Sequence, residues 1–456
     1  MPDLPPEDRV TETRPARTFS AAILGRAGWG FADQAMSSVT NFAISLVAAR
    51  AFGAADLGAY TIVFATYLLV INAARQLALA PLVIRFSTGT VQAWRRATAD
   101  ATGLSIVVGC LGGLASLAVG VVLGGPIGSG LIALGILMPP LLLQDAWRFA
   151  FFAARRGRTA FVNDLVWAIV LVPVLTIVLL SGPASIAGLI VAWGVSGTVS
   201  AVLGIAQSGV RPRLRGAVSW VHEHGDIAPP MTLESVISMV AGQVTTYAIA
   251  SVAGLATVGA IRAAQLLLGP FFMLFQGLQL IAAPEAAALL QVSPRALWRG
   301  CVVYATGLVA ALLVYVVVVE AVPENVGVLL LRQSWDLGHA VLPAMAVLFA
   351  AAFVYTAPTI GLRVLAEARL VLGNGLISSA SGLLLGIGGA AAGGAVPSTL
   401  GSAAANFLAA IPAWLQLRRI VQARTRDAGA TVPGAAPPPA DTPTAPLAPT
   451  TDRPLP

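Results

Sequence analysis

The chain has 456 residues, of which 57% are apolar and only 10% are charged, and its mean hydropathy is +0.83. Soluble domains carry about 25% charged residues, so this composition excludes a water-soluble fold. The formal net charge of +7 comes from arginines in short segments between apolar runs, not from one basic patch, so nucleic acid binding is not expected.

The N-terminal residues carry several arginines before the first long apolar run. That run is as long as a full membrane span and lacks a clear small-residue cleavage site, so we interpret it as a retained first span. Similar runs of about 20 residues recur almost to the end of the chain, and Gly, Pro or Arg mark their edges. Twelve spans are predicted, near residues 28–49, 58–83, 100–123, 128–152, 160–181, 184–206, 232–253, 258–283, 297–322, 338–362, 366–391 and 397–417.

These spans divide the chain into two lobes of six helices each, joined by a loop. The last residues are dominated by Ala, Pro and Thr without a periodic apolar stripe, so they are expected to be disordered. The predicted parts are a cytoplasmic N-terminal segment (1–27), an N-lobe (28–206), a cytoplasmic inter-lobe loop (207–231), a C-lobe (232–417) and a disordered cytoplasmic tail (418–456).

The arginines between the spans are distributed very unevenly. One alternating set of connections holds almost all of them, whereas the opposite set holds Arg50 and Arg332 only. Because arginines near span ends favour the cytoplasmic side, both termini are predicted to be cytoplasmic.

An internal repeat relates the two halves. At a shift of 201 positions, GAADLGAY (53–60) aligns with GLATVGAI (254–261), and Asp33 aligns with Glu234; at a shift of 211, Arg158 and Asn163 align with Arg369 and Asn374. Two six-span repeats begin on the same side of the membrane, so they should enclose a central cleft with a substrate site near the midplane. The fold class predicted is therefore an all-α integral membrane protein with two pseudo-symmetric lobes.

Ionisable residues within the predicted spans are the main candidates for a site, because each costs about 2.5 to 3.5 kcal/mol at the centre of a bilayer unless it is partnered. Arg75 lies well inside the second span and aligns with Gln276, so polar groups are expected at matching depth in the two lobes. Arg148 and Arg262 lie nearer span ends and could extend to the interface; Arg148 could also pair with Asp145 on the same helix face. We expect Arg75, Arg148, Arg262 and Gln276 to bind substrate.

Three carboxylates are candidates for ion coupling or gating. Asp33 and Glu234 begin their predicted spans, where a helix N-terminus would favour a negative charge whatever the function. Asp164 is a weaker candidate, since Gly375 occupies the matching position. No catalytic constellation, phosphate loop, metal site or cofactor site is predicted, and both cysteines, Cys110 and Cys301, fall inside apolar segments.

Several segments carry a family resemblance: WGFADQAMSSVTNFAISLVAARAFGAADLGAYTIV (29–63), RQLALAPLVIRFS (75–87), LQDAWRFAFFAARRGRTAFVNDLVWA (143–168) and GAIRAAQLLLGP (259–270). They resemble polysaccharide biosynthesis and export proteins of the multidrug/oligosaccharidyl-lipid/polysaccharide (MOP) exporter superfamily, which include O-antigen and teichoic-acid flippases. The first of them contains the AR-x-x-G turn typical of that group, followed by a glycine and an aromatic residue: Ala49, Arg50, Gly53, Gly58 and Tyr60.

The resemblance implies a transporter, not an enzyme, that flips a polyprenyl-diphosphate-linked oligosaccharide from the cytoplasmic to the outer leaflet. Arginines suit a diphosphate because they bind its oxygens in pairs. The expected location is the bacterial inner membrane, and the expected form is a monomer. Membrane lipids and the polymerase or glycosyltransferases of the same pathway are further expected partners.

Two alternatives remain open. One is a multidrug exporter of the multidrug and toxic compound extrusion (MATE) type, which would use the carboxylates to hold cationic drugs. The other is a membrane-embedded glycan polymerase or glycosyltransferase, for which the longest outer connection, near 323–337, is short.

Overall fold

The computed structural model describes residues 16–87, 90–224 and 230–430, and every regular element in these ranges is helical. The N-terminal half contains α1 (Ala16–Ala51), α2 (Ala54–Ala74), η1 (Arg75–Leu79), α3 (Ala80–Phe86), α4 (Val91–Leu123), α5 (Gly125–Ala153), α6 (Gly157–Leu180) and α7 (Ile186–Ser208). The short elements η2 (Leu214–Gly216) and α8 (Ala217–His224) follow. The C-terminal half contains α9 (Pro230–Ala253), α10 (Leu255–Leu267), α11 (Gly269–Val292), α12 (Pro294–Glu320), α13 (Glu324–Leu331), α14 (Gln333–Val364), α15 (Ala368–Gly393) and α16 (Ala395–Ala430).

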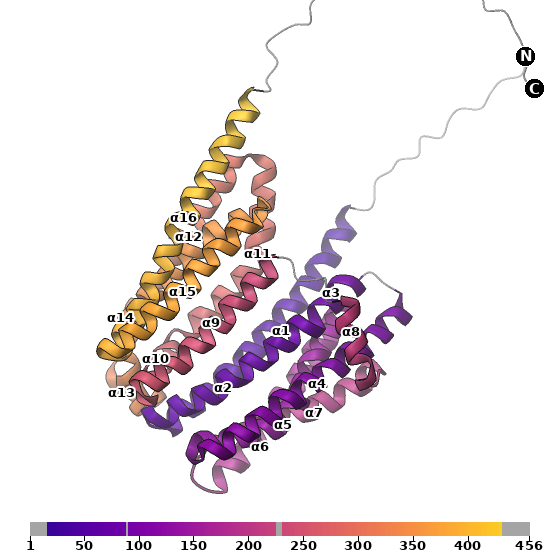
Figure 1. The fold of residues 1–456 in the computed structure, drawn as a ribbon, viewed down its shortest axis with the longest axis vertical. Coiled ribbons are helices and arrows are strands. Elements are labelled where there is room, and N and C mark those ends of the chain that lie inside the picture. Colours follow the sequence, from indigo (N-terminus) through magenta and orange to yellow (C-terminus); the bar gives the residue numbers. More distant parts are fainter. Residues whose placement is uncertain (1–15, 88–89, 225–229, 431–456) are drawn as a thin grey trace, which may run out of the picture.

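Nine helices in the described ranges are long and apolar enough to cross a membrane, and α2, η1 and α3 together form one of them. The other three predicted spans correspond to α1, to α9 and to the pair α10 and α11. The crossing by α10 and α11 is interrupted at Leu268, two residues before Pro270, whose ring and missing N–H disfavour a continuous helix. Figure 1 shows these helices side by side as an all-helical bundle.

The helices extend beyond the predicted membrane spans at both ends of the chain. The first helix begins at Ala16, within the predicted N-terminal segment 1–27, and the last continues to Ala430, within the predicted tail 418–456. Apolar length marks only the part of a helix that lies in lipid, whereas backbone hydrogen bonding continues into water. Residues 1–15, 225–229 and 431–456 lie outside the described residues, so the predicted disorder of the tail is untested.

Matching details confirm that the two halves are structural repeats. Arg155 and Ala366, 211 positions apart, are two of the three described non-glycine residues with positive φ. They follow α5 and α14, which are the fourth membrane crossings of the two halves. The amide of Asn163 donates to Gln207 Oε1 at 2.9 Å, and the amide of Asn374 donates to Gln416 Oε1 at 2.8 Å.

The two halves meet at repeat-related glycines on α2 and α10. A Cβ atom at Gly58 would lie 1.9 Å from the carbonyl oxygen of Leu255, and one at Gly259 would lie 1.9 Å from that of Ala54. Only glycines therefore allow this backbone contact. In Figure 1 the halves approach each other at this crossing and separate toward the ends of α1 and α16 that lead to the chain termini. The two halves thus contact each other at one end, called the closed end below, and their helices lie farther apart at the other, called the open end, where α1 begins and α16 ends (Figure 1).

Candidate functional site

A cavity of about 630 Å³ lies between the two halves, and we call it the central cavity. Its walls come from α1, α2, α5 and α6 of the N-terminal half and from α10, α11 and α14 of the C-terminal half. All four predicted substrate-binding residues line it: Arg75, Arg148, Arg262 and Gln276. Its volume falls in the range of about 300 to 1,000 Å³ that is common for ligand sites.

Arg75 lies at the start of η1, a single π-helical turn within the second crossing. Such turns insert an extra residue and often occur at functional sites. The Arg75 guanidinium donates two hydrogen bonds to Asp145, from Nε to Oδ2 at 2.8 Å and from Nη2 to Oδ1 at 2.7 Å. It also lies 5.5 Å from the centre of the Phe149 ring. Arg75 therefore reaches the cavity as a partner in a bidentate ion pair, with 31% of its side chain exposed.

Arg148 joins three helices of the N-terminal half. From α5 its Nη2 lies 2.7 Å from Asp33 Oδ2 on α1, and its Nε lies 3.3 Å from Asp164 Oδ2 on α6. Asp145 on its own helix is the most distant of its carboxylate partners, at 3.9 Å. The amide of Gln144 donates to Asp164 Oδ1 at 2.7 Å and completes this buried network.

This geometry corrects three sequence interpretations. Asp33 does not lie at a helix N-terminus, because α1 begins 17 residues earlier, and its carboxylate is balanced by Arg148. Arg148 does not extend to the interface, since only 10% of its side chain is exposed. The main partner of Asp145 is Arg75, not Arg148. The first difference arises because α1 continues beyond its apolar stretch, and the other two arise because the ion pairs join helices that are distant in sequence.

The network contains more carboxylates than arginines. Asp33, Asp145 and Asp164 face Arg75 and Arg148, so full ionisation would leave one negative charge in excess. Asp33 Oδ1 is also buried without a hydrogen-bond partner. A buried, unbalanced carboxylate is costly, so this cluster is suited to taking up a proton.

Arg262 is the candidate whose charge is least satisfied. It extends from α10 across the interface, where Nη2 donates to Ser45 Oγ on α1 at 2.7 Å, and Nη1 to Gln265 Oε1 at 3.3 Å. Its guanidinium carbon lies 5.8 Å from the centre of the Phe64 ring, and its Nε is buried without a partner. In the described part of the chain, no carboxylate pairs with Arg262. It is therefore suited to binding an anion.

The C-terminal half replaces the charged cluster with neutral residues. At the shift of 211, Asp145, Arg148 and Asp164 correspond to Thr356, Thr359 and Gly375. At the shift of 201, Arg75 corresponds to Gln276, which lines the central cavity. Glu234, the counterpart of Asp33, lies in the first two turns of α9, but its side chain falls outside the described residues.

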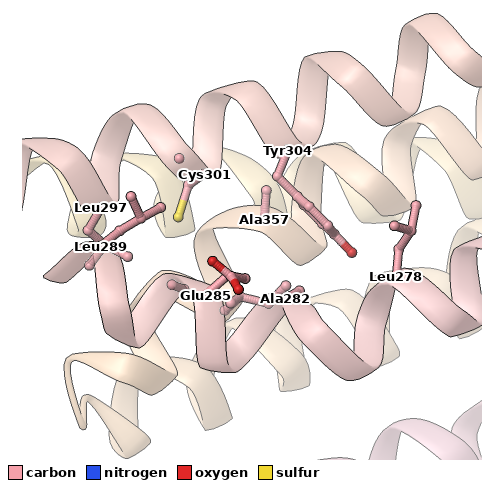
Figure 2. A pocket seen from close by; sticks show the side chains of 11 residues that line it. Leu278, Ala282, Glu285, Leu289, Leu297, Cys301, Tyr304 and Ala357 are labelled. Atoms are coloured by element: carbon pink, nitrogen blue, oxygen red, sulfur yellow. The ribbon is translucent and has the colours of Figure 1, made fainter. Parts of the chain in front are cut away.

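A separate cavity of about 160 Å³, shown in Figure 2, lies within the C-terminal half between α11, α12 and α14. Its lining is almost entirely apolar, with Glu285, Tyr304 and Cys301 as its polar side chains. The helix face of α11 that carries Glu285 is opposite the one that carries Gln276, since nine residues correspond to two and a half turns. This cavity is therefore distinct from the central one.

Sequence reasoning missed several groups at the site. Aromatic side chains, including Tyr67 and Trp167, form part of the cavity wall, and Tyr67 packs edge-on against Trp193 with the ring centres 4.7 Å apart. The hydrogen bond of Asn163 to Gln207 could have been expected from the sequence, because Asn163 matches Asn374 in the repeat. Among the described residues, no group of three or more His, Cys, Asp or Glu side chains could hold a metal ion.

Comparison with known proteins defines the fold. No family model matches the chain, and no curated protein matches it in sequence. Solved structures match over almost the whole chain. An inward-facing MATE family transporter of the MOP superfamily has 13% identity and a TM-score of 0.64, covering 88% of this chain and 96% of its own.

An outward-facing MATE family transporter of the same superfamily has 15% identity and a TM-score of 0.56, covering 89% of this chain and 96% of its own. A MOP superfamily transporter from Pyrococcus furiosus, described as having a binding pocket of reversed polarity, has 13% identity and a TM-score of 0.54, with the same coverage of both chains. The chain thus has the fold of MATE family transporters of the MOP superfamily.

Proposed function

We propose that this protein is a transporter that moves a polyprenyl-diphosphate-linked oligosaccharide from the cytoplasmic to the outer leaflet by alternating access, for export of a cell-surface polysaccharide. The observation that carries this proposal is Arg262, a cation at the interface between the halves without a carboxylate partner among the described residues. A diphosphate supplies the missing negative charge and accepts several hydrogen bonds.

The depths of the arginines suggest a path for the headgroup. Arg262 lies seven residues from the start of α10 at the closed end, whereas Arg75 lies 21 residues from the start of α2. At about 1.5 Å per residue, the two arginines differ in depth by roughly 20 Å. An anionic headgroup entering from the open end would meet Arg75 first and then reach Arg262, near the crossing of α2 and α10. Gln276 and Arg148 line the same path.

The arginine-rich connections favour an orientation for this path. They lie at the end where α1 begins and α16 ends, so we propose that this end faces the cytoplasm of a bacterial cell, with the protein in the inner membrane. The open side would then receive a lipid-linked sugar assembled in the cytoplasm. We propose that a monomer is sufficient, that membrane lipids surround it, and that the pathway's polymerase or glycosyltransferases are its functional partners.

Leaflet exchange in proteoliposomes tests the proposal. Fluorescent polyprenyl-diphosphate oligosaccharide would be followed with wild type, Arg262→Gln and Arg75→Ala, and with Arg369→Gln as a control that removes an exposed charge. Hydrogen bonds to charged groups contribute about 1.5 to 3 kcal/mol, so the loss of Arg262 should slow exchange roughly 10- to 150-fold. Unchanged exchange in both cavity variants would remove these arginines from the site.

A second candidate function is export of cationic compounds coupled to an ion, which the excess carboxylate in the N-terminal half favours. Asp33, Asp164 and Glu234 would then couple or gate transport. Wild-type protein that exports a lipophilic cation along an imposed proton or sodium gradient, but does not exchange lipid-linked sugars, would favour this candidate. Asp33→Asn should abolish that export.

A further inference from the structure

A second cavity between the halves is built differently from the central one. It has a volume of about 240 Å³, lies between α2, α9 and α10, and is called here the side cavity. Arg262, Phe64, Leu68 and Gln265 line both cavities, so Arg262 lies at the boundary between them. A ligand held at Arg262 therefore has the side cavity within immediate reach.

The polar groups of the side cavity can both donate and accept hydrogen bonds. The Thr246 hydroxyl donates to Gly242 O at 3.1 Å and the Thr61 hydroxyl to Leu57 O at 2.7 Å, so each oxygen retains lone pairs as an acceptor. Gln265 accepts from Arg262 through Oε1 at 3.3 Å, and its NH2 group remains a donor. The Gln243 amide makes no hydrogen bond to another described residue.

The charge and size of the side cavity narrow the choice of ligand. None of its lining residues is a carboxylate, so a cation would have no counter-charge. Its hydroxyl and amide groups would lose hydrogen bonds to water if an acyl chain replaced that water. Its volume is slightly below the range of about 300 to 1,000 Å³ for drug-sized ligands, which suits one compact ligand better than a long oligosaccharide.

We propose that the side cavity binds the uncharged sugar attached directly to the diphosphate, while the diphosphate occupies the position beside Arg262. This inference rests on the proposed function and adds a specificity site to it. Gln243 and Thr246 are the residues of α9 that distinguish a sugar-bearing lipid from one without sugar. The Phe64 ring, beside the Arg262 guanidinium, provides an apolar surface for the sugar's C–H groups.

The experiment compares two lipids in the same proteoliposomes: fluorescent polyprenyl diphosphate carrying one neutral N-acetylhexosamine, and the same lipid without sugar. The variant is Gln243→Leu combined with Thr246→Val. The matched control is Thr245→Val, the preceding residue, whose hydroxyl makes an equivalent bond to Ala241 O at 2.7 Å. Its methyl group faces Gly386 of α15 instead of the side cavity.

Wild type should exchange the sugar-bearing lipid faster than the lipid without sugar. The double variant should slow the sugar-bearing lipid about tenfold, as expected for losing one to two neutral hydrogen bonds, and leave the other lipid unchanged. Thr245→Val should change neither rate. An equal loss for both lipids, or no loss for either, would overturn the sugar site while the flippase proposal stands. If wild type moves neither lipid, both proposals fail.

Discussion

Replacing Gly58 by alanine should open the end of the protein at which the two halves meet. The added Cβ would lie 1.9 Å from Leu255 O, and the shortfall from the 3.4 Å of ordinary van der Waals contact is 1.5 Å. The obstacle is backbone, which cannot rotate away as a side chain does. The crossing between α2 and α10 must therefore separate.

The added Cβ destabilises only the conformation in which α2 and α10 are in contact. Forcing additional atoms into a packed contact costs about 1 to 3 kcal/mol, whereas the helical preference of alanine over glycine acts wherever α2 remains helical and cancels between the two states. The population ratio of the state closed at this end to the state open there should fall roughly 5- to 150-fold. Gly259→Ala should act in the same way, because its Cβ meets Ala54 O at the same distance.

Electron paramagnetic resonance distance measurements can report this shift. Spin labels at Asp56→Cys and Ala256→Cys, both exposed beside the crossing, would be introduced after replacing Cys110 and Cys301 by alanine. The wild-type glycine background should give mainly a short distance, and Gly58→Ala a new, longer one. Gly373→Ala is the control, since its Cβ would meet nothing within 4 Å. An unchanged distance distribution in Gly58→Ala would refute the role of the glycine crossing.

Three further outcomes are expected. Arg148→Met should lower the stability of the purified protein by about 3 to 5 kcal/mol in thermal unfolding, because it leaves buried carboxylates unbalanced. The control Arg213→Gln removes an exposed ion pair with Asp100 and should cost about 1 kcal/mol or less. Equal losses of stability in the two variants would contradict the argument from burial. Asn163→Ala should lower the free energy of unfolding by about 1 to 3 kcal/mol more than the same change at the repeat-related Asn374, since Asn163 also forms hydrogen bonds with Gln144 and Ser200 O. Similar melting temperatures of the two variants would show that those bonds contribute nothing to stability. Arg262→Lys should recover only part of the leaflet exchange lost in Arg262→Gln, because a lysine lacks the planar paired donors of arginine, and full recovery would indicate that charge alone is sufficient.

Sequence patterns predicted the helical class, the repeat and the three arginines that line the central cavity. The lengths of the apolar runs and the alignment of Gly58 with Gly259 are properties that recur along the chain. They are therefore visible in the sequence alone. The partners of Arg148 were not predictable in this way, since Asp33 and Asp164 lie on helices whose rotation about their axes depends on packing. The π-helical turn at Arg75 was equally hidden, because nothing in the residues RQLAL distinguishes it from an ordinary α-helical turn.

The start of α1 illustrates a different limit. Hydropathy identifies where a helix enters lipid, but the helix continues where the sequence becomes polar, so Asp33 was assigned to a helix end when it lies deep within one. The side cavity was also beyond sequence analysis, because Gln243 and Thr246 become neighbours of Arg262 only when α9 packs beside α10.

The concentration of ion pairs in one half has a mechanical consequence. Arg148 links α1, α5 and α6 through short charged contacts, which hold these helices at fixed angles to one another. The matching positions of the C-terminal half carry threonine and glycine, and its second crossing is interrupted at Leu268. The N-terminal half should therefore move as a stiff body, while bending during a conformational cycle concentrates in the C-terminal half, near the junction of α10 and α11.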